Sequence, residues 1–185
     1  MSNQPIIALD VHGVVFNNPL PGFIDDIGES TGVGVPAIRH RWRTELRLEF
    51  WEGRLSDDEM WARLAPGCDA TQLRRDLEAR YTLGPFGSFV EHHTGPIWLL
   101  SNHRTDWLMA RLDRFGLTDR FERIYISDAI GAAKPSDRAF SVLTDRTGLH
   151  YYDDSDRNVN AARKLGITAS VVTGSNTPVP VSGHR

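Results

Sequence analysis

Cysteine and long apolar runs are nearly absent from this sequence of 185 residues. Cys68 is the only cysteine, which excludes an intrachain disulfide and a metal site made of cysteines alone. No apolar run approaches the roughly 18 residues that a membrane-spanning helix requires. Residues 1–5 also lack the basic start of a secretory signal. We therefore expect a cytoplasmic protein that does not act at a membrane.

Lysine is the second scarce residue. Of 21 basic residues, 19 are arginines, and the two lysines are Lys134 and Lys164. The net charge of -3 argues against a nucleic-acid partner, since proteins that bind nucleic acids usually carry a basic surface. The apolar content of 40% is that of a globular protein and excludes a disordered chain. We expect a small-molecule partner, and a chain that acts as a monomer or homodimer.

Five short apolar runs predict the strands of a parallel sheet. The runs are residues 6–11, 97–101, 123–127, 149–153 and 168–173. Helical patterns separate the later runs: one ends at Gly116, one begins at Ser136 and one ends at Gly166. Strands and helices that alternate in this way imply right-handed crossovers and helices on both faces of the sheet. The predicted fold class is α/β, with a Rossmann-like parallel sheet.

Residues 17–96 interrupt this alternation. Apolar residues recur at helical spacing from Pro36 onward, and Ser56 begins a capping-box sequence that is completed by Glu59. The segment therefore predicts an inserted helical bundle, or cap, over residues 17–96. The core is then discontinuous and consists of residues 1–16 and 97–185. Residues 174–185 carry two prolines and little periodicity, which indicates a loosely held tail.

Chemically useful side chains stand after the predicted strands, where ligands bind in open parallel sheets. They are Asp10 after the first run, Ser101 and Asn102 at the second, Lys134 after the third, and Asp153 and Asp154 at the fourth. Three carboxylates at neighbouring strand ends need cations to offset their repulsion. A divalent cation and Lys134 would leave the site neutral and ready for a phosphate dianion. Mg²⁺ is the natural choice, because all the available ligands are oxygens.

These segments, in this order, resemble the four motifs of the haloacid dehalogenase superfamily, and the resemblance extends over essentially the whole chain. The matching segments are residues 7–15, 99–102, 131–135 and 152–155. The insert is similar in position to the cap domain of that family. Residues 51–56 bear a weaker similarity to a cap segment of its sugar-phosphate phosphatases and of the phosphatase domains linked to epoxide hydrolases. The resemblance implies a Mg²⁺-dependent phosphatase.

The resemblance also implies a nucleophile and a metal site. Asp10 would attack phosphorus in line and form a phosphoaspartate, which water later cleaves. Asp10, the backbone carbonyl of His12 and Asp154 would bind Mg²⁺ directly. Asp153 would assist, either directly or through water.

The remaining motif residues would hold the phosphoryl group. Ser101 and the amide of Asn102 would bind its oxygens, and Lys134 would neutralise the charge that develops during transfer. Lys164 follows an arginine in a helical pattern, which is typical of a solvated surface. The expected substrate is a small phosphorylated metabolite, such as a sugar phosphate.

His12 departs from the motif of the family. The phosphatases usually have a second aspartate there, which protonates the leaving oxygen and then activates water. Histidine could take over this acid and base role, since its pKa lies near neutrality. Alternatively, His12 supplies only its carbonyl, and the enzyme is slow or prefers good leaving groups. In a third case, the site does not hydrolyse phosphate at all.

Two other functions therefore stay open. The first is a metal-independent 2-haloacid dehalogenase, since relatives without the second aspartate include enzymes that cleave carbon–halogen bonds. Those dehalogenases generally lack an intact acidic pair in the fourth motif, so Asp153 and Asp154 favour phosphate. The second is a non-catalytic binding or scaffold protein, which is suggested by His12 alone.

The predicted cap offers several side chains that could contact the substrate. They are Arg39, His40, Arg41, Arg43, Glu49, Trp51, Glu52 and Arg54. Our predicted contacts are Arg41, Trp51 and Glu52. An arginine could bind an anionic group through two hydrogen bonds, and a tryptophan could stack on a sugar or another ring.

Overall fold

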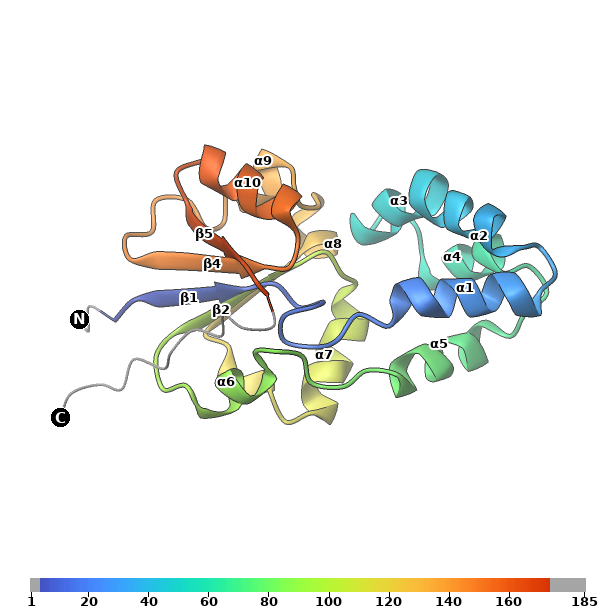
Figure 1. The fold of residues 1–185 in the computed structure, drawn as a ribbon, viewed down its shortest axis with the longest axis horizontal. Coiled ribbons are helices and arrows are strands. Elements are labelled where there is room, and N and C mark those ends of the chain that lie inside the picture. Colours follow the sequence, from blue (N-terminus) through green and yellow to red (C-terminus); the bar gives the residue numbers. More distant parts are fainter. Residues whose placement is uncertain (1–3, 174–185) are drawn as a thin grey trace.

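The centre of the molecule is a sheet of five parallel strands in the order β3-β2-β1-β4-β5 (Figure 1). The structure is a computed structural model and describes residues 4–173. The strands are β1 (Ile6–Leu9), β2 (Ile97–Ser101), β3 (Arg123–Ile126), β4 (Leu149–Asp153) and β5 (Thr168–Val171). Each strand lies within the apolar run that predicted it. The α/β fold class and the parallel sheet are therefore confirmed.

Helices cover both faces of this sheet, because alternate residues of a strand point to opposite sides. Leu9 of β1 belongs to one buried cluster together with Leu108 of α7 (Thr105–Arg114). Its neighbour Ala8 belongs to a second cluster with Val159 of α10 (Asp156–Lys164). The other elements around the sheet are α6 (Gly87–His92), the 3-10 turn η2 (Thr118–Arg120), α8 (Ser127–Ile130) and α9 (Asp137–Phe140). Figure 1 shows α9 and α10 on one side of the sheet, with α6 and α7 on the other.

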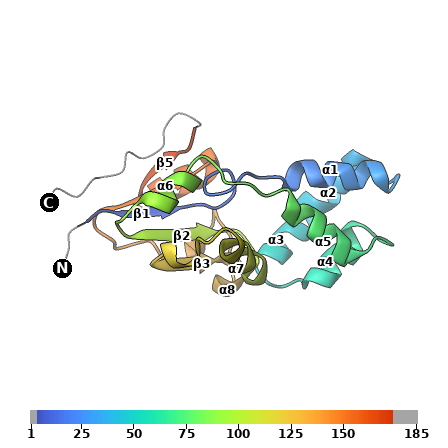
Figure 2. The same cartoon turned by 90° about the horizontal axis from the view of Figure 1, so that it is seen from below.

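Most of the helices inserted between β1 and β2 form a separate layer beyond the carboxyl ends of the strands (Figures 1 and 2). They are α1 (Leu20–Ser30), α2 (Val35–Arg41), the π-helical turn η1 (Trp42–Leu46), α3 (Arg47–Trp51), α4 (Asp57–Leu64) and α5 (Ala70–Ala79). The capping box predicted at Ser56 is present, since Ser56 Oγ accepts from the Glu59 amide and Glu59 accepts from the Ser56 amide. The helical spacing after Pro36 is also confirmed. It extends over α2, η1 and α3, with Ile38, Trp42, Leu46 and Phe50 buried.

Helix α6 differs from the other inserted helices, because it lies against the sheet (Figure 2). The ring centroids of Phe86, which precedes α6, and Tyr152 of β4 are 5.4 Å apart. The division of the chain at residue 96 stays a prediction, and the predicted tail at 174–185 lies outside the described residues. Among the helices of residues 4–173, none is long and apolar enough to cross a membrane.

Candidate active site

The loop after β1 carries Asp10 to the carboxyl edge of the sheet. β1 pairs with β2 on one side and with β4 on the other, so the ends of these three strands meet. The Asp10 amide donates to the carbonyl of Tyr152 at 2.8 Å, which extends the pairing with β4 by one residue. Gly13 has a φ of 76°, and a Cβ at this position would lie 2.2 Å from Oδ2 of Asp154. Glycine therefore allows the Asp10 loop to approach the acidic pair after β4.

Lys134 lies at the centre of the site and is only 5% exposed. Its Nζ is 2.7 Å from Oδ1 of Asp10 and 2.8 Å from Oδ2 of Asp153. It also donates to the hydroxyl of Tyr151 at 2.7 Å and to the carbonyl of Leu100 at 2.9 Å. Burial by itself would lower the pKa of Lys134, but the carboxylates of Asp10 and Asp153 outweigh it and raise that pKa. The ammonium is therefore held charged at neutral pH.

The three carboxylates form a compact oxygen cluster. One oxygen each from Asp10, Asp153 and Asp154 lies within 4.8 Å of the others. Burial, with repulsion from Asp153 and Asp154, raises the pKa of Asp10 to about 7 despite the contact with Lys134. Burial and repulsion from Asp153 raise the pKa of Asp154 to about 6. One ammonium does not offset this negative charge, and the oxygen donors fit a hard divalent cation such as Mg²⁺.

Asp153 and Asp154 have different surroundings. Oδ2 of Asp153 accepts from Lys134 and from the hydroxyl of Tyr151, while Oδ1 accepts from the Ser155 amide. Asn158 donates to both oxygens. Burial raises the pKa of Asp153, but the contact with Lys134 and these hydrogen bonds lower it overall. Asp154 is exposed, so its carboxylate is the freer of the two to bind a cation.

Ser101 and Asn102 end β2 beside Lys134. Ser101 is 1% exposed, and within residues 4–173 its Oγ has no hydrogen-bond partner. An unpaired buried hydroxyl is costly unless a ligand completes its hydrogen bonds. The Asn102 side chain bonds the backbone of Lys134 twice: its Nδ2 donates to the Lys134 carbonyl at 2.9 Å, and its Oδ1 accepts from the Lys134 amide at 2.7 Å. Asn102 therefore fixes the loop that presents the ammonium.

The His12 ring contacts groups that lie outside the cluster of three carboxylates. Its Nε2 lies 3.0 Å from the hydroxyl of Tyr81 and 3.5 Å from Nη1 of Arg111. Burial, with the positive charges of Arg111 and Lys134, lowers the pKa of His12 to about 3. The imidazole is therefore neutral at physiological pH and lacks the imidazolium proton that a general acid would donate to a leaving group.

Arg111 of α7 is a second buried cation close to the site, with 1% exposure. It forms an ion pair with Glu78 of α5 through both arms, and Nε donates to Oε2 at 3.1 Å. Its Nη1 donates to Nε2 of His103 at 2.9 Å. The guanidinium also lies over the ring of Tyr81, 3.3 Å from the centroid. Arg111 thus connects the inserted helices with the sheet domain beside His12.

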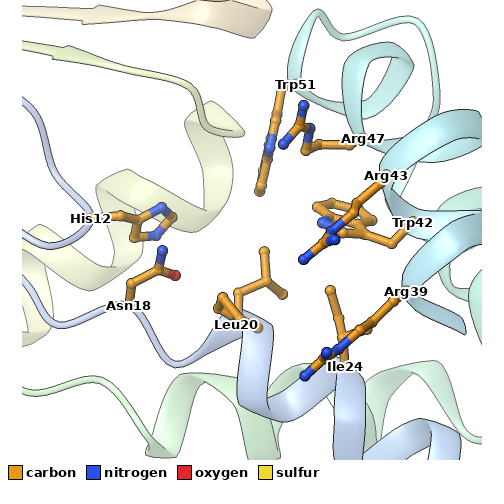
Figure 3. Close-up of a pocket in the computed structure, with 10 residues that line it drawn as sticks. His12, Asn18, Leu20, Ile24, Arg39, Trp42, Arg43, Arg47 and Trp51 are labelled. Carbon is orange, nitrogen blue, oxygen red and sulfur yellow. The ribbon is translucent and has the colours of Figure 1, made fainter. Parts of the chain in front are cut away.

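Two cavities lie between the inserted helices and the strand ends. The first, of about 340 Å³, is lined by His12, Asn18, Leu20, Pro21, Ile24, Arg39, Trp42, Arg43, Arg47 and Trp51. Figure 3 shows His12 and Asn18 on one side of it and the three arginines on the other. The second, of about 280 Å³, is lined by Arg47, Leu48, Trp51, Asn102, Ala133, Lys134, Pro135, Ser155, Arg157 and Asn158. Arg47 and Trp51 line both cavities, so the two cavities are neighbours in the same part of the site.

Solved structures share this architecture. A HAD-family enzyme of Bacteroides thetaiotaomicron, in complex with magnesium and inorganic phosphate, is 18% identical over 95% of this chain and 98% of its own, with a TM-score of 0.73. A predicted HAD-like family hydrolase of Porphyromonas gingivalis is 19% identical over 97% of this chain and 96% of its own, with a TM-score of 0.74. The chain has the haloacid dehalogenase fold. L-2-haloacid dehalogenase of Xanthobacter autotrophicus shares it at 21% identity and a TM-score of 0.63, over 91% of this chain and 77% of that enzyme.

No protein-family model and no curated protein matches the sequence. At these identities the likeness establishes the haloacid dehalogenase fold alone. One of the similar enzymes was solved in complex with magnesium and inorganic phosphate, and another is a dehalogenase. The reaction of this chain therefore depends on its own site residues.

Within this haloacid dehalogenase fold, the six predicted strand-end residues converge on one site. They are Asp10, Ser101, Asn102, Lys134, Asp153 and Asp154. Of the predicted substrate contacts, Trp51 lines both cavities. Arg41 instead donates to the carbonyls of Arg63 and Leu64, at 3.1 Å each. Glu52 accepts from the Ala133 amide at 3.1 Å and pairs with Arg54, so its carboxylate ties the insert to the loop before Lys134.

Sequence reasoning missed Arg111, Glu78 and Tyr81. A signal for Arg111 was present in the sequence, because Arg111 interrupts the apolar positions Leu108, Leu112 and Phe115 at helical spacing. A charged residue on the buried face of a helix requires a partner. The identity of that partner depended on the placement of α5, which no local pattern specifies.

Proposed function

We propose that this chain is a Mg²⁺-dependent phosphatase that hydrolyses a small phosphomonoester through a phosphoaspartate on Asp10. The observation that carries this proposal is the contact of Asp10 with Lys134 inside a cluster of three carboxylates. Displacement of halide from carbon by an aspartate needs neither a divalent cation nor two further carboxylates. Transfer of a phosphoryl group from a phosphomonoester dianion to an aspartate requires cations that offset the charge of both anions.

The residues divide the work as follows. Asp10 is the nucleophile: one Oδ forms a bond to phosphorus while the ester P–O bond breaks, and the leaving oxygen takes up a proton from water. Water then attacks phosphorus and releases inorganic phosphate and free Asp10. Lys134 favours the charged form of Asp10 against the effect of burial and offsets charge on the phosphoryl oxygens, and Ser101 Oγ donates a hydrogen bond to one of them.

Asp10, the His12 carbonyl and Asp154 are the proposed ligands of Mg²⁺. When bound, the ion would offset the negative charge of the carboxylates and of the phosphoryl group. Asp153 acts differently, since its oxygens already accept from Lys134, Tyr151, Ser155 and Asn158. We assign it the task of holding Lys134 in place.

His12 supplies its backbone carbonyl rather than a proton in this proposal. The support is geometric: Nε2 lies 3.0 Å from the Tyr81 hydroxyl and 3.5 Å from Nη1 of Arg111, two groups outside the carboxylate cluster. An enzyme without a carboxylic acid at this position should favour substrates whose leaving group needs little protonation. Aryl phosphates are therefore expected to react faster than alkyl phosphates.

A metal-independent dehalogenase is the second candidate, because the fold is shared with L-2-haloacid dehalogenase and the second aspartate is replaced by His12. A non-catalytic scaffold is the third. One experiment separates them: phosphate release from 4-nitrophenyl phosphate, with Mg²⁺ or with EDTA, and halide release from 2-chloropropionate. We expect Mg²⁺-dependent phosphate release that Asp10→Asn abolishes. Phosphate release that persists unchanged in Asp10→Asn would contradict the proposal, halide release would favour the dehalogenase, and the absence of both would favour the scaffold.

The cap division, the cytoplasmic location and the monomeric or homodimeric state remain proposals that rest on the sequence. A cap over the strand ends fits the phosphatase, because exclusion of bulk water protects an aspartyl phosphate while it forms.

A further inference from the structure

The arginines of the inserted helices differ in how they are paired. Five arginines lie between Val35 and Leu55. Arg39 pairs with Asp25, and Arg54 pairs with Glu49 and Glu52. Arg41 donates to two backbone carbonyls. Arg43 and Arg47 are different, because neither side chain forms a hydrogen bond or an ion pair with any residue of the described range 4–173.

These two unpaired arginines line the first cavity. Arg43 and Arg47 are four residues apart around the π-helical turn η1, so their side chains share one side of this helical segment. Figure 3 shows both directed at the space that faces His12 and Asn18. Among the residues that the structure describes, no aspartate or glutamate lines the cavity. The charge of Arg43 helps to lower the pKa of Asp25, but the carboxylate of Asp25 forms its ion pair with Arg39. The cavity therefore presents uncompensated positive charge.

Apolar and aromatic side chains complete the walls of this cavity. Trp42 and Trp51 lie on the same side as the arginines, and Leu20 and Ile24 of α1 lie below them (Figure 3). Aromatic walls reduce the access of water to a bound anion, which strengthens its interaction with a guanidinium. Such walls also fit the carbon frame of a small organic molecule.

The cavity adjoins the nucleophile side of the site. His12, two residues after Asp10, lines it directly. Arg47 and Trp51 also line the second cavity, which contains Lys134 and Asn102. A phosphoryl group at Asp10 and Lys134 therefore leaves the remaining part of the substrate next to Arg43 and Arg47.

We propose that the substrate carries a second anionic group, a carboxylate or a second phosphate, and that Arg43 and Arg47 bind it. This inference rests on the proposed phosphatase function and specifies its substrate class. A guanidinium group binds a carboxylate or a phosphate through paired hydrogen bonds between opposite charges. A hydroxyl group is neutral and forms weaker hydrogen bonds with it. A neutral sugar monophosphate would leave both arginines without a partner.

The test compares matched substrates that differ in the second group. 3-Phosphoglycerate carries a carboxylate where glycerol 3-phosphate carries a hydroxymethyl group, and fructose 1,6-bisphosphate carries a phosphate where fructose 6-phosphate carries a hydroxyl. We expect kcat/KM to favour at least one anionic member by about tenfold or more, as charged hydrogen bonds would give. Whichever pair shows the preference identifies the second group.

Variants assign the preference to these arginines. In the double variant R43Q/R47Q the preference should fall to within about twofold of unity. In R43K/R47K it should survive in part, since lysine keeps the positive charge but lacks the paired donors of the guanidinium group. Arg63→Gln is the matched control, because Arg63 is an exposed arginine of α4 that lines neither cavity. It should keep the wild-type preference. A wild-type enzyme that hydrolyses both members of each pair equally, or a preference that persists in R43Q/R47Q, overturns the inference.

A binding measurement separates this inference from the proposed function. Dissociation constants of 3-phosphoglycerate, glycerol 3-phosphate and the two fructose phosphates are measured by calorimetry on Asp10→Asn, which needs no turnover. Tighter binding of an anionic member by about tenfold, lost in Asp10→Asn with R43Q/R47Q, supports the arginine site even if 4-nitrophenyl phosphate is not hydrolysed. Hydrolysis of 4-nitrophenyl phosphate combined with equal dissociation constants leaves the phosphatase standing and overturns the arginine site.

Discussion

Lys134 and Arg111 are both buried cations, and they lie next to different residues of the Asp10 loop, Asp10 itself and His12. Lys134 contacts Asp10, Asp153, Tyr151 and the carbonyl of Leu100, all of which belong to the sheet domain. Arg111 contacts His103 of the sheet domain, but its carboxylate partner, Glu78, comes from α5 of the inserted helices. One cation thus completes the site, and the other connects the site to the insert.

This difference indicates different tasks. The partners of Lys134 include the nucleophile, so loss of its charge alters the reacting groups directly. Arg111 forms no ion pair with the carboxylate cluster; it borders the side chain of His12, at 3.5 Å. We therefore expect variants of Lys134 to affect catalysis most, and variants of Arg111 to affect stability and the placement of the inserted helices.

The largest expected effect is that of Lys134→Ala. Removal of the ammonium leaves Asp10 and Asp153 without their shared cation, so kcat for 4-nitrophenyl phosphate should fall by about 100-fold to 1,000-fold. Steady-state kinetics at saturating Mg²⁺ measures this. Lys164→Ala is the control, because Lys164 is an exposed residue at the end of α10, and it should keep wild-type kcat. Equal losses of kcat in the two variants would contradict the catalytic role assigned to Lys134.

The second effect is the coupling of Arg111 and Glu78. Arg111→Met leaves Glu78 unpaired and should reduce the free energy of unfolding by about 2 to 3 kcal/mol. A double-mutant cycle with Glu78→Gln should return a coupling energy of about 1 to 3 kcal/mol. Urea unfolding measures both, and kcat should fall less than in Lys134→Ala.

Arg75→Met provides the control for this cycle. Arg75 is an exposed residue of α5 whose side chain bonds only Gln72 among the described residues. Its replacement should change the free energy of unfolding by no more than about 0.5 kcal/mol. A cycle without coupling would show that the ion pair does not connect α5 and α7.

The two cations also show what the sequence could reveal. Lys134 was found because it is one of two lysines and stands after a predicted strand, in order with Asp10 and the acidic pair. Such signals are local, since the end of a parallel strand fixes where the next side chains gather. All five strands were predicted for the same reason, as each is a short and largely apolar run.

The missed contacts are long-range. Glu78 and Arg111 are 33 residues apart, and Tyr81 and His12 are 69 apart. Their meeting depends on how α5 and the segment after it return to the sheet domain, which no periodicity specifies. The same applies to Arg41 and Glu52, whose positions in the sequence suggested contact with the substrate. Their side chains instead bond the protein backbone: Arg41 donates to the carbonyl of Arg63, and Glu52 accepts from the amide of Ala133.

The third effect tests His12, whose ring lies 3.5 Å from Arg111 and whose backbone carbonyl is a proposed ligand of Mg²⁺. His12→Ala keeps the carbonyl and removes the ring, so any loss of kcat/KM should be below about tenfold and equal for an aryl and an alkyl phosphate. 4-Nitrophenyl phosphate and glycerol 3-phosphate are the two substrates. A loss at least tenfold greater on the alkyl phosphate would assign His12 as the proton donor instead.

The smallest effect concerns His93, a buried side chain whose pKa is affected by the cation Arg120 but by no carboxylate among residues 4–173. Burial and the nearby charge of Arg120, which donates to the His93 carbonyl at 2.7 Å, lower the pKa of His93. The carboxylates of Asp10 and Asp153 have the opposite effect on Lys134. Because the folded-state pKa lies below the unfolded value near 6.5, the unfolded chain binds the proton first on acidification. The contribution of His93 to stability is therefore complete above pH 6.5 and decreases as the pH falls through the folded-state pKa.

His93→Gln removes this titration, so the variant should lose less stability than the wild type between pH 7.5 and pH 5.5. Urea unfolding at the two values measures the difference, which should be smaller than the effects of the three preceding variants. His92→Gln is the control, because His92 is exposed and adjacent in the chain; it should leave the pH dependence of the wild type intact. If His93→Gln and the wild type lose stability equally, a buried histidine beside Arg120 is not held neutral, and the contrast with Lys134 loses its electrostatic basis.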